Sequence, residues 1–397
     1  MRPMIELTTS SVNKHQLSSV DYLHLPYLPF DLVEQILCRL PVNTLLRIRC
    51  VCKSFNSLIS DPKFAKKHLS MSTRRRLHIF SRPEPLRKYT FTSCPLHYVF
   101  TTVPTNVPGF YPSNNHDYTQ HTIVGSCNGI LCLVREYAHM SFLLFWNPSI
   151  RKVKELSPLC YPDSFHTTYG FGYDIVNDNY KVVAVFSYNV PDSSGDLVDK
   201  TEVKINILGT NFWKNLPDSP FNCMLSHEPG RFVSGNINWL ASKHFHHSPC
   251  FIVSLDLRKE SYQKLLLPDC GELDVSILIL SVLKDCLCMT YGHDVWIMKE
   301  YGNNESWTKL FTVPYMRYCR KSYHLRKTIY MFEDGRVLLE VESNRVESNR
   351  DSFLKLIVYD PRIGTFKFVK FQNKSFYNPI FSNIPEICIE SLISTCF

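Results

Sequence analysis

The pattern of apolar and polar positions divides the chain into two parts. Between Leu28 and Ser72 apolar residues recur every three or four positions, which is typical of amphipathic helices. After Leu77 short runs of β-branched and aromatic residues alternate with turn residues, which is typical of strands. The sequence therefore predicts an α+β multidomain protein: a polar, flexible tail over 1–27, a helical domain over 28–72 and an all-β domain over 73–397.

Prolines punctuate the helical part into four short helices. Pro29 and Pro41 stand where helices begin, because the first helical turn has no acceptor for the N–H that proline lacks. Asp61-Pro62 opens a fourth helix in the same way. In the first helix one apolar face is predicted, formed by Leu32, Val33, Ile36, Leu37 and Leu40. A unit of about 45 residues is too small to stabilise itself comfortably, so part of this apolar surface is expected to contact a partner.

Charge adds a second feature to the helical part. The whole chain carries a formal net charge of +8, and ten Lys or Arg against three acids lie between Leu28 and Arg76. Such a basic module indicates an acidic partner, either a protein or a nucleic acid. The run Arg74-Arg75-Arg76 lacks interleaved aromatic residues and a readout helix, so we interpret it as a solvated helix end leading into the β domain rather than a nucleic-acid site.

The helical part resembles the F-box. The resemblance covers Leu28 to about Ser72 and rests on Leu28-Pro29, Leu32, Ile36-Leu37, Leu40-Pro41, Leu45, Val51-Cys52-Lys53 and the run from Leu58 through Asp61-Pro62 to Phe64. Two positions depart from the family pattern. Phe55 stands where the family usually has Trp, and Ile48 stands where it often has Phe. Both residues are still large and apolar.

The resemblance implies docking on a Skp-type adaptor, an acidic helical protein that links F-box proteins to cullin and RING subunits. The residues expected at that interface are Leu28, Pro29, Leu32, Ile36, Leu40, Pro41 and Leu45, with Lys53 as a basic contact at the rim. The alternative is that the same leucines form only the core of a free helical domain.

A loose repeat runs through the β part. Each unit ends with a sequence similar to W/F-x-x-L-P. The ends fall at Pro158, Pro217, Pro268, Pro314 and Gln372, at intervals of 59, 51, 46 and 58 residues. These intervals fit one four-stranded blade each and predict a β-propeller, which we expect to have six blades. The sixth blade would combine residues 77–121 with a last strand over Ile387–Leu392, closing the ring between the two ends of the chain.

The β part resembles the F-box-associated domain of plant F-box proteins. The matching landmarks are Gly125-Ser126-Cys127-Asn128-Gly129, Trp146-Asn147-Pro148, Tyr169 to Asp174, Tyr180-Lys181-Val182-Val183 and Glu390-Ser391-Leu392. Standard kelch and WD-repeat arrays are not indicated, because the sequence has neither a Gly-Gly nor a Trp-Asp pair. The two resemblances imply a non-catalytic substrate-recognition subunit of a Skp–cullin–F-box ubiquitin ligase that binds an unknown protein target. The alternative is a free-standing propeller that binds a glycan or nucleic acid.

Motifs that could carry chemistry have simpler interpretations. Gly125 to Gly129 resembles a nucleophile elbow, but a strand rather than a helix follows it, so we interpret it as a turn. Tyr169-Gly170-Phe171-Gly172 has too few glycines for a dinucleotide loop and is predicted to be a β-turn. His244, His246 and His247 lack further ligands at metal-binding spacing. We therefore expect no catalytic residue, no cofactor and no metal.

The cellular setting follows from what the chain lacks. No signal-like segment, long apolar stretch or CxxC pair occurs, and the fifteen cysteines are dispersed, as in reduced intracellular proteins. We expect a cytoplasmic or nuclear protein that binds neither membranes nor nucleic acid. Two polar insertions, 104–120 and 189–200, are predicted to be loops and are the first candidates for target binding.

Overall fold

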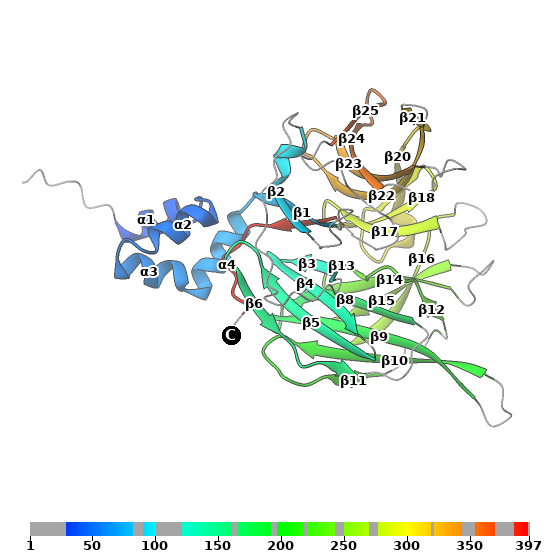
Figure 1. Cartoon of the computed structure of the whole chain (residues 1–397), viewed down its shortest axis with the longest axis horizontal. Coiled ribbons are helices and arrows are strands. Elements are labelled where there is room, and N and C mark those ends of the chain that lie inside the picture. The colour runs from blue at the N-terminus through cyan, green and yellow to red at the C-terminus, as the bar shows by residue number, and fades with distance from the viewer. Residues whose placement is uncertain are drawn as a thin grey trace, which may run out of the picture.

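The computed structural model describes residues 29–81, 90–100, 121–137, 139–160, 166–191, 197–217, 221, 223–242, 250–269, 277–318, 321–343, 354–369 and 385–395. Within these ranges four helices precede six β-sheets (Figure 1). None of the helices is long and apolar enough to cross a bilayer. Residues 1–28, 104–120 and 243–249, about which the sequence made predictions, lie outside the described residues.

The four predicted helices are present, and three of them begin at the predicted prolines. They are α1 (Phe30–Leu37), α2 (Val42–Ile48), α3 (Lys53–Ser60) and α4 (Pro62–Met71). Pro29 and Pro41 directly precede α1 and α2, and Pro62 is the first residue of α4. The Asp61 side chain accepts a hydrogen bond of 2.7 Å from the backbone N–H of Lys63, which caps α4. Local sequence chemistry therefore fixes where each helix starts.

Five antiparallel sheets follow one another along the chain. The first has β3 (Thr122–Cys127), β4 (Ile130–Tyr137), β5 (Met140–Asn147), β6 (Lys152–Glu155) and the short β7 (Leu159–Cys160) beside β5. The second has β8 (His166–Asp174), β9 (Asn179–Pro191), β10 (Leu197–Ile207) and β11 (Lys214–Leu216). The third has β12 (Met224–Leu225) and β13 (Arg231–Val233), both paired with β14 (Asn236–Ser242), then β15 (Cys250–Asp256) and β16 (Ser261–Leu266).

The fourth sheet has β17 (Leu278–Leu283), β18 (Cys286–Tyr291), β19 (Asp294–Met298) and β20 (Trp307–Thr312), with a 3-10 turn, η3 (Asn304–Ser306), before β20. The fifth has β21 (Met316–Tyr318), β22 (Lys321–Met331), β23 (Val337–Ser343), β24 (Leu354–Asp360) and β25 (Thr365–Phe368). Each predicted repeat ends just after the last strand of its sheet, at β6, β11, β16, β20 and β25. The repeat prediction is confirmed.

The sixth sheet joins the two ends of the chain. It pairs β1 (Arg75–Ser81) with β2 (Thr90–Pro95) on one side and with β26 (Glu386–Ile389) on the other, and η1 (Leu96–Phe100) follows β2. The inner strand of each sheet contacts the inner strand of the next, in the order β26, β3, β8, β13, β17, β22 and back to β26. The protein is thus a closed six-bladed propeller, as predicted. The closing strand ends at Ile389, three residues before the predicted end.

Two predicted loops are strands. Tyr169-Gly170-Phe171-Gly172 lies inside β8, so the predicted turn is wrong. A Cβ atom on Gly170 would lie 2.4 Å from Ile237 Cγ2, and one on Gly172 would lie 2.3 Å from Phe232 Cδ2. These glycines allow β8 to approach the next blade. The two ends of the predicted loop 189–200 are also strand, because β9 and β10 pair up to Pro191 and Leu197. Residues 192–196 between them lie outside the described residues.

The motif Gly125 to Gly129 is only partly the predicted turn, because its first three residues end strand β3. Asn128 and Gly129, with φ of +53° and +87°, form the turn between β3 and β4. Burial raises the pKa of the Cys127 thiol to about 12. Cys127 is therefore protonated at neutral pH and does not have the thiolate that a nucleophile needs.

Buried histidines are expected to make the propeller acid-sensitive. Burial lowers the pKa of His78, on β1, from 6.5 to about 3, and its ring stacks on Phe91 at 5.3 Å. The folded protein keeps His78 neutral while the unfolded chain takes up a proton below pH 6.5, so stability is complete above pH 6.5 and falls toward pH 3. At pH 5 this loss should be about 2 kcal/mol.

Urea unfolding measures this effect. Between pH 7.5 and pH 5, His78→Leu should lose less unfolding free energy than wild type does. The exposed control His97→Gln should behave like wild type, and equal losses in all three proteins would refute the assignment.

Candidate functional site

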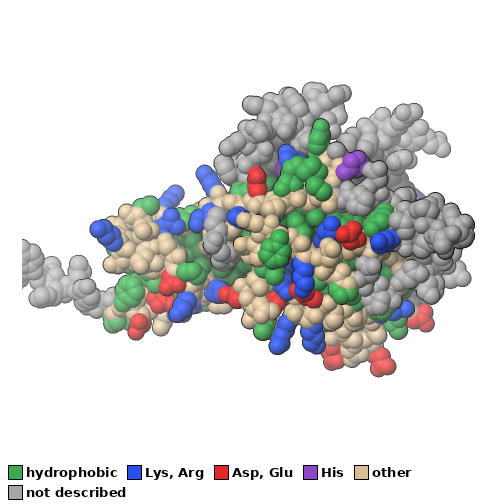
Figure 2. Space-filling model, turned by 90° about the horizontal axis from the view of Figure 1, so that it is seen from below, with side chains coloured by type: hydrophobic (Ala, Val, Ile, Leu, Met, Phe, Trp, Pro, Cys, Tyr) green, Lys and Arg blue, Asp and Glu red, His purple; other side chains and the backbone are tan. Residues whose placement is uncertain are grey.

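The outer surface of α1 carries an exposed apolar stripe, formed by Leu32 and Ile36. Their exposed fractions are 44% and 52%, and they stand one helical turn apart. Pro29, just before α1, is also exposed. In Figure 2 the helical module, at the left, shows apolar side chains among charged ones. Side chains this apolar and this accessible on so small a unit indicate a docking surface.

The opposite side of α1 packs inward and fixes the orientation of the stripe. The buried core of the module consists of Leu37, Cys38, Val42, Leu45, Ile59, Phe64 and Ala65. Lys67 Nζ on α4 donates a 2.7 Å hydrogen bond to Glu34 Oε1 on α1. The ring Nε2 of His68 lies 2.9 Å from the carbonyl oxygen of Leu40. The stripe is therefore presented by a packed helix rather than by a loose segment.

The residues predicted for the adaptor interface fall into three groups. Pro29, Leu32, Ile36 and Lys53 are exposed, whereas Leu40 and Pro41 are half-buried. Leu28 lies outside the described residues. Leu45 is 0% exposed, so it supports the surface from inside and does not form it. The structure thus keeps the predicted stripe on α1 and corrects the role of Leu45.

Two exposed apolar residues were missing from the predicted set. Phe30 opens α1 with 53% of its surface exposed, and Val51, between α2 and α3, is 71% exposed. The sequence offered a signal for both: Val51 belongs to the motif Val51-Cys52-Lys53, and Phe30 stands three and seven residues before Val33 and Leu37 on the predicted apolar face. Neither signal says whether the side chain is exposed.

Positive charge surrounds this surface. Six of the ten predicted cations are exposed and form no ion pair with another described residue: Arg39, Arg47, Arg49, Lys53, Lys63 and Arg74. Free surface cations attract an acidic partner at a distance and speed its association. The charge distribution is consistent with the acidic partner predicted from the sequence.

The helical module is attached to the propeller through α4. Lys66 on α4 pairs with Asp178 in the β8–β9 turn, and Tyr173 donates a hydrogen bond to the same carboxylate. These contacts lower the pKa of Asp178. The Ser72 hydroxyl donates to the carbonyl oxygen of Glu390 at 3.2 Å. Figure 1 shows α4 beside the propeller and α1 and α2 farther out.

Searching the described ranges for metal ligands gives no group of three His, Cys, Asp or Glu residues that could hold an ion. The histidines at 244, 246 and 247 fall in a part of the chain that the structure does not describe.

Comparisons with known proteins assign both parts of the chain. The family model for the F-box associated beta propeller domain matches residues 96–395, and the F-box domain model matches residues 25–67. The F-box/kelch-repeat protein At3g23880 of Arabidopsis thaliana is 32% identical over 72% of this chain and 79% of its own length. The F-box protein CPR1 of the same plant is 29% identical over 83% of this chain and 84% of its own length.

Solved structures offer only a distant likeness. A polysaccharide lyase of family PL25, an ulvan lyase, superimposes with a TM-score of 0.40 at 10% identity, covering 64% of this chain and 73% of its own. We take nothing about activity from a similarity this low.

Proposed function

Because this chain belongs to the family of plant F-box proteins with an F-box-associated propeller, we propose that it is the substrate-recognition subunit of a Skp–cullin–F-box ubiquitin ligase. The helical module would bind the Skp-type adaptor and, through it, the cullin and RING subunits. The propeller would bind a protein target. The chain itself would perform no bond-making step.

One observation carries the first half of this proposal. Leu32 and Ile36 are exposed on a helix that packs into the module through Leu37 and the half-buried Val33. A free helical domain, the alternative considered above, would gain stability by turning such residues inward. Their exposure therefore favours a surface that another polypeptide covers. Pro29, Leu40, Pro41 and Lys53 would border that surface.

The second half of the proposal concerns the other end of the propeller. The β8–β9 turn, which holds Asp178, contacts α4, so the equivalent turns after each inner strand lie on the face of the helical module. Antiparallel alternation places the connections after the second and fourth strands on the opposite face. Exposed Tyr137, Ile277 and Tyr315 belong to those connections. We propose this opposite face as the target-binding face.

Placing the two surfaces at opposite ends suggests a bridging mechanism. A target held on one face and an adaptor on the other would bring target lysines near a ubiquitin-charged enzyme supplied by other subunits. The gain is a higher effective concentration of the two reactants. Ubiquitination would mark the target for degradation.

Co-purification separates this proposal from its alternative. We expect the tagged full chain, expressed in plant cells with a proteasome inhibitor, to recover a Skp-type adaptor and a cullin. Replacing Pro29 and Pro41 by alanine should reduce that recovery, because both prolines border the proposed surface and fix where the helices start. Recovery of a glycan or nucleic acid without adaptor or cullin would instead support a free-standing propeller. Proximity labelling in the same cells would identify candidate targets.

A further inference from the structure

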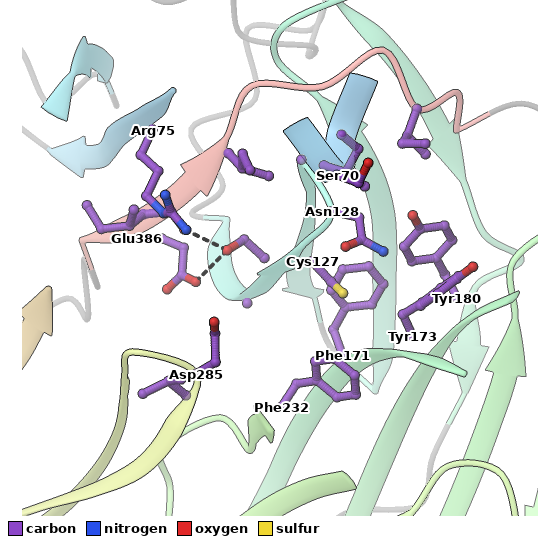
Figure 3. A pocket seen from close by; sticks show the side chains of 18 of the residues that line it. Ser70, Arg75, Cys127, Asn128, Phe171, Tyr173, Tyr180, Phe232, Asp285 and Glu386 are labelled. Carbon is purple, nitrogen blue, oxygen red and sulfur yellow. Dashed lines mark hydrogen bonds between the residues drawn. The ribbon is translucent and has the colours of Figure 1, made fainter. Parts of the chain in front are cut away.

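A large cavity lies between the helical module and the centre of the propeller. Its volume is about 1400 Å³, and residues of α3, α4 and the inner strands line it. Figure 3 shows Arg75 and Glu386 on one side of this space and Tyr173 and Tyr180 on the other. A cavity of this size exceeds what a few waters need, and it is large enough for a small organic ligand.

One cation in the cavity wall, Lys327, forms no ion pair or hydrogen bond with another described residue. Lys327, on inner strand β22, lines the cavity but is only 6% exposed. Among the described residues it makes no hydrogen bond and no ion pair within 4.0 Å. A buried ammonium group without such a contact is unfavourable unless something else supplies negative charge. Of the described side chains, Glu228, Glu386 and Glu340 attract this ammonium group electrostatically, but none of them forms an ion pair with it.

The backbone of β22 is irregular around this lysine. The pairing of β22 with β23 shifts register between Leu325 and Lys327 and again between Thr328 and Tyr330. Bulges of this kind redirect side chains and are frequent beside binding sites. The flanking bulges thus set Lys327 and Thr328 apart from the regular alternation of the strand.

A second buried cation lies on the same wall. Arg231, on inner strand β13, is 7% exposed, and its Nε donates to the carbonyl oxygen of Leu280 at 3.2 Å. Its terminal nitrogen is 3.5 Å from Glu228 Oε2, which is long for a hydrogen bond. Burial, and then the charge of Arg231, lower the pKa of Lys327 to about 8, so this ammonium group is largely charged at pH 7.

Neutral hydrogen-bond donors and an excess of positive charge in the cavity wall also favour binding of an anion. The hydroxyls of Ser281 and Thr328, both on the cavity wall, lie 2.5 Å apart, and Cys288 Sγ lies 3.5 Å from the Thr328 hydroxyl oxygen. Of the two hydroxyls, the one that accepts the mutual bond keeps a hydrogen that it can donate to another acceptor. Seven Lys or Arg side chains line the cavity against four Asp or Glu. Of these acids, Glu386 already accepts a 2.8 Å hydrogen bond from Ser126.

We propose that this cavity binds a small oxyanion, the phosphate group of a small molecule or free phosphate, with Lys327 and Arg231 as its cationic ligands and Ser281 or Thr328 as a hydroxyl donor. Two cations and a hydroxyl are the donor set that phosphate oxygens accept. The ligand would contact inner strands of three blades, β13, β17 and β22, and would therefore stabilise the closed ring. The alternative is that no anion binds, and that Glu228, Glu340 and Glu386 neutralise the charge of Lys327 from beyond contact distance, with water between them.

Anion-dependent unfolding of the full chain distinguishes the two explanations. Sodium phosphate at pH 7 should raise the melting temperature saturably, by about 2–4 °C or more, beyond the effect of sodium chloride at equal ionic strength. Lys327→Met should abolish this rise, whereas Lys299→Met, which removes an exposed lysine outside the cavity, should keep it. No specific rise in wild type, or an equal rise in Lys327→Met, would overturn the proposal.

Calorimetry on wild type keeps the test independent of how well Lys327→Met folds. Sulfate is the suitable probe, because its charge does not change between pH 7 and pH 9.5. Its affinity should fall roughly tenfold or more over this range as Lys327 loses its proton. The other charged groups that act on Lys327 are Arg231, Glu228, Glu386 and Glu340, and burial raises the pKa of Glu340. A constant affinity would contradict the role of Lys327. Tighter binding of pyrophosphate than of phosphate would support the phosphate group of a larger molecule, and equal binding would support a free anion.

Discussion

Replacing Leu32 and Ile36 together by aspartate is expected to weaken binding of the Skp-type adaptor at least about 100-fold. Both side chains are about half exposed, so their replacement opens no cavity in the core of the helical module. Each change removes apolar area from the proposed interface and places a carboxylate against an acidic partner. Apolar residues at the centre of an interface commonly contribute about 2 kcal/mol each. Because Leu32 and Ile36 are neighbours, their combined loss is expected to be smaller than the sum of about 4 kcal/mol, which sets the lower bound of about 100-fold. Isothermal titration of purified adaptor into the full-length variant measures the loss.

Two comparisons make this result specific to the α1 stripe. Phe212→Asp with Ile363→Asp makes the same chemical change at two exposed apolar residues of the propeller, and it should leave adaptor affinity unchanged. Leu45→Ala removes a fully buried side chain and should destabilise the module by about 2–5 kcal/mol. Its loss of adaptor binding should therefore be accompanied by loss of helical circular dichroism, whereas the aspartate variant should keep that signal. Unchanged affinity in the aspartate variant would exclude the stripe from the interface.

Gly129→Ala is expected to destabilise the propeller by about 3 kcal/mol or more. Gly129 lies in the β3–β4 turn with φ of +87°, and a Cβ atom there would be 2.2 Å from Ser391 Oγ and 2.9 Å from the carbonyl oxygen of Ile389. The end of the chain would have to move away. Ser391 donates a 2.7 Å hydrogen bond to the carbonyl oxygen of Asn128, and buried Asn147 donates to the carbonyl oxygens of Ser391 and Ile393 at 3.1 and 2.8 Å. Gly129→Ala should therefore disrupt these hydrogen bonds, which help to close the ring of blades.

Gly235→Ala is the matched control for this prediction. Gly235 occupies the corresponding turn of another blade with φ of +82°, but nothing lies within 4 Å of its would-be Cβ. Gly235→Ala should lower the free energy of unfolding by only about 1 kcal/mol, which is the strain of an alanine in the left-handed conformation. Urea unfolding monitored by tryptophan fluorescence gives both free energies of unfolding. Equal losses would show that contact with the chain end contributes little to stability.

Features with a local cause were predictable from the sequence. The helices begin at Pro29, Pro41 and Pro62 because proline suits only the first turn. The repeat could be predicted because similar sequences occur at the outer strands with which the blades end. Pairing of the last strand with β1 followed from the need to protect sheet edges, and the structure shows it.

Features caused by distant residues were not predictable. Gly170 resembled a turn residue, but the reason for it is Ile237, which lies on another blade. Periodicity found the apolar positions of the helical module but could not say which are covered, so Leu45 and Leu32 were given the same role. Arg231, Ser281 and Lys327 come from three different strands and leave no common motif in the sequence.

The central claim is that the helical module presents a surface for another polypeptide. Titrating purified Skp-type adaptor into the full chain measures this directly by calorimetry. We predict a one-to-one complex with a Kd below about 1 μM, which corresponds to about −8 kcal/mol. A chain whose helices are folded, and which remains alone in solution with tens of micromolar adaptor present, would contradict the account.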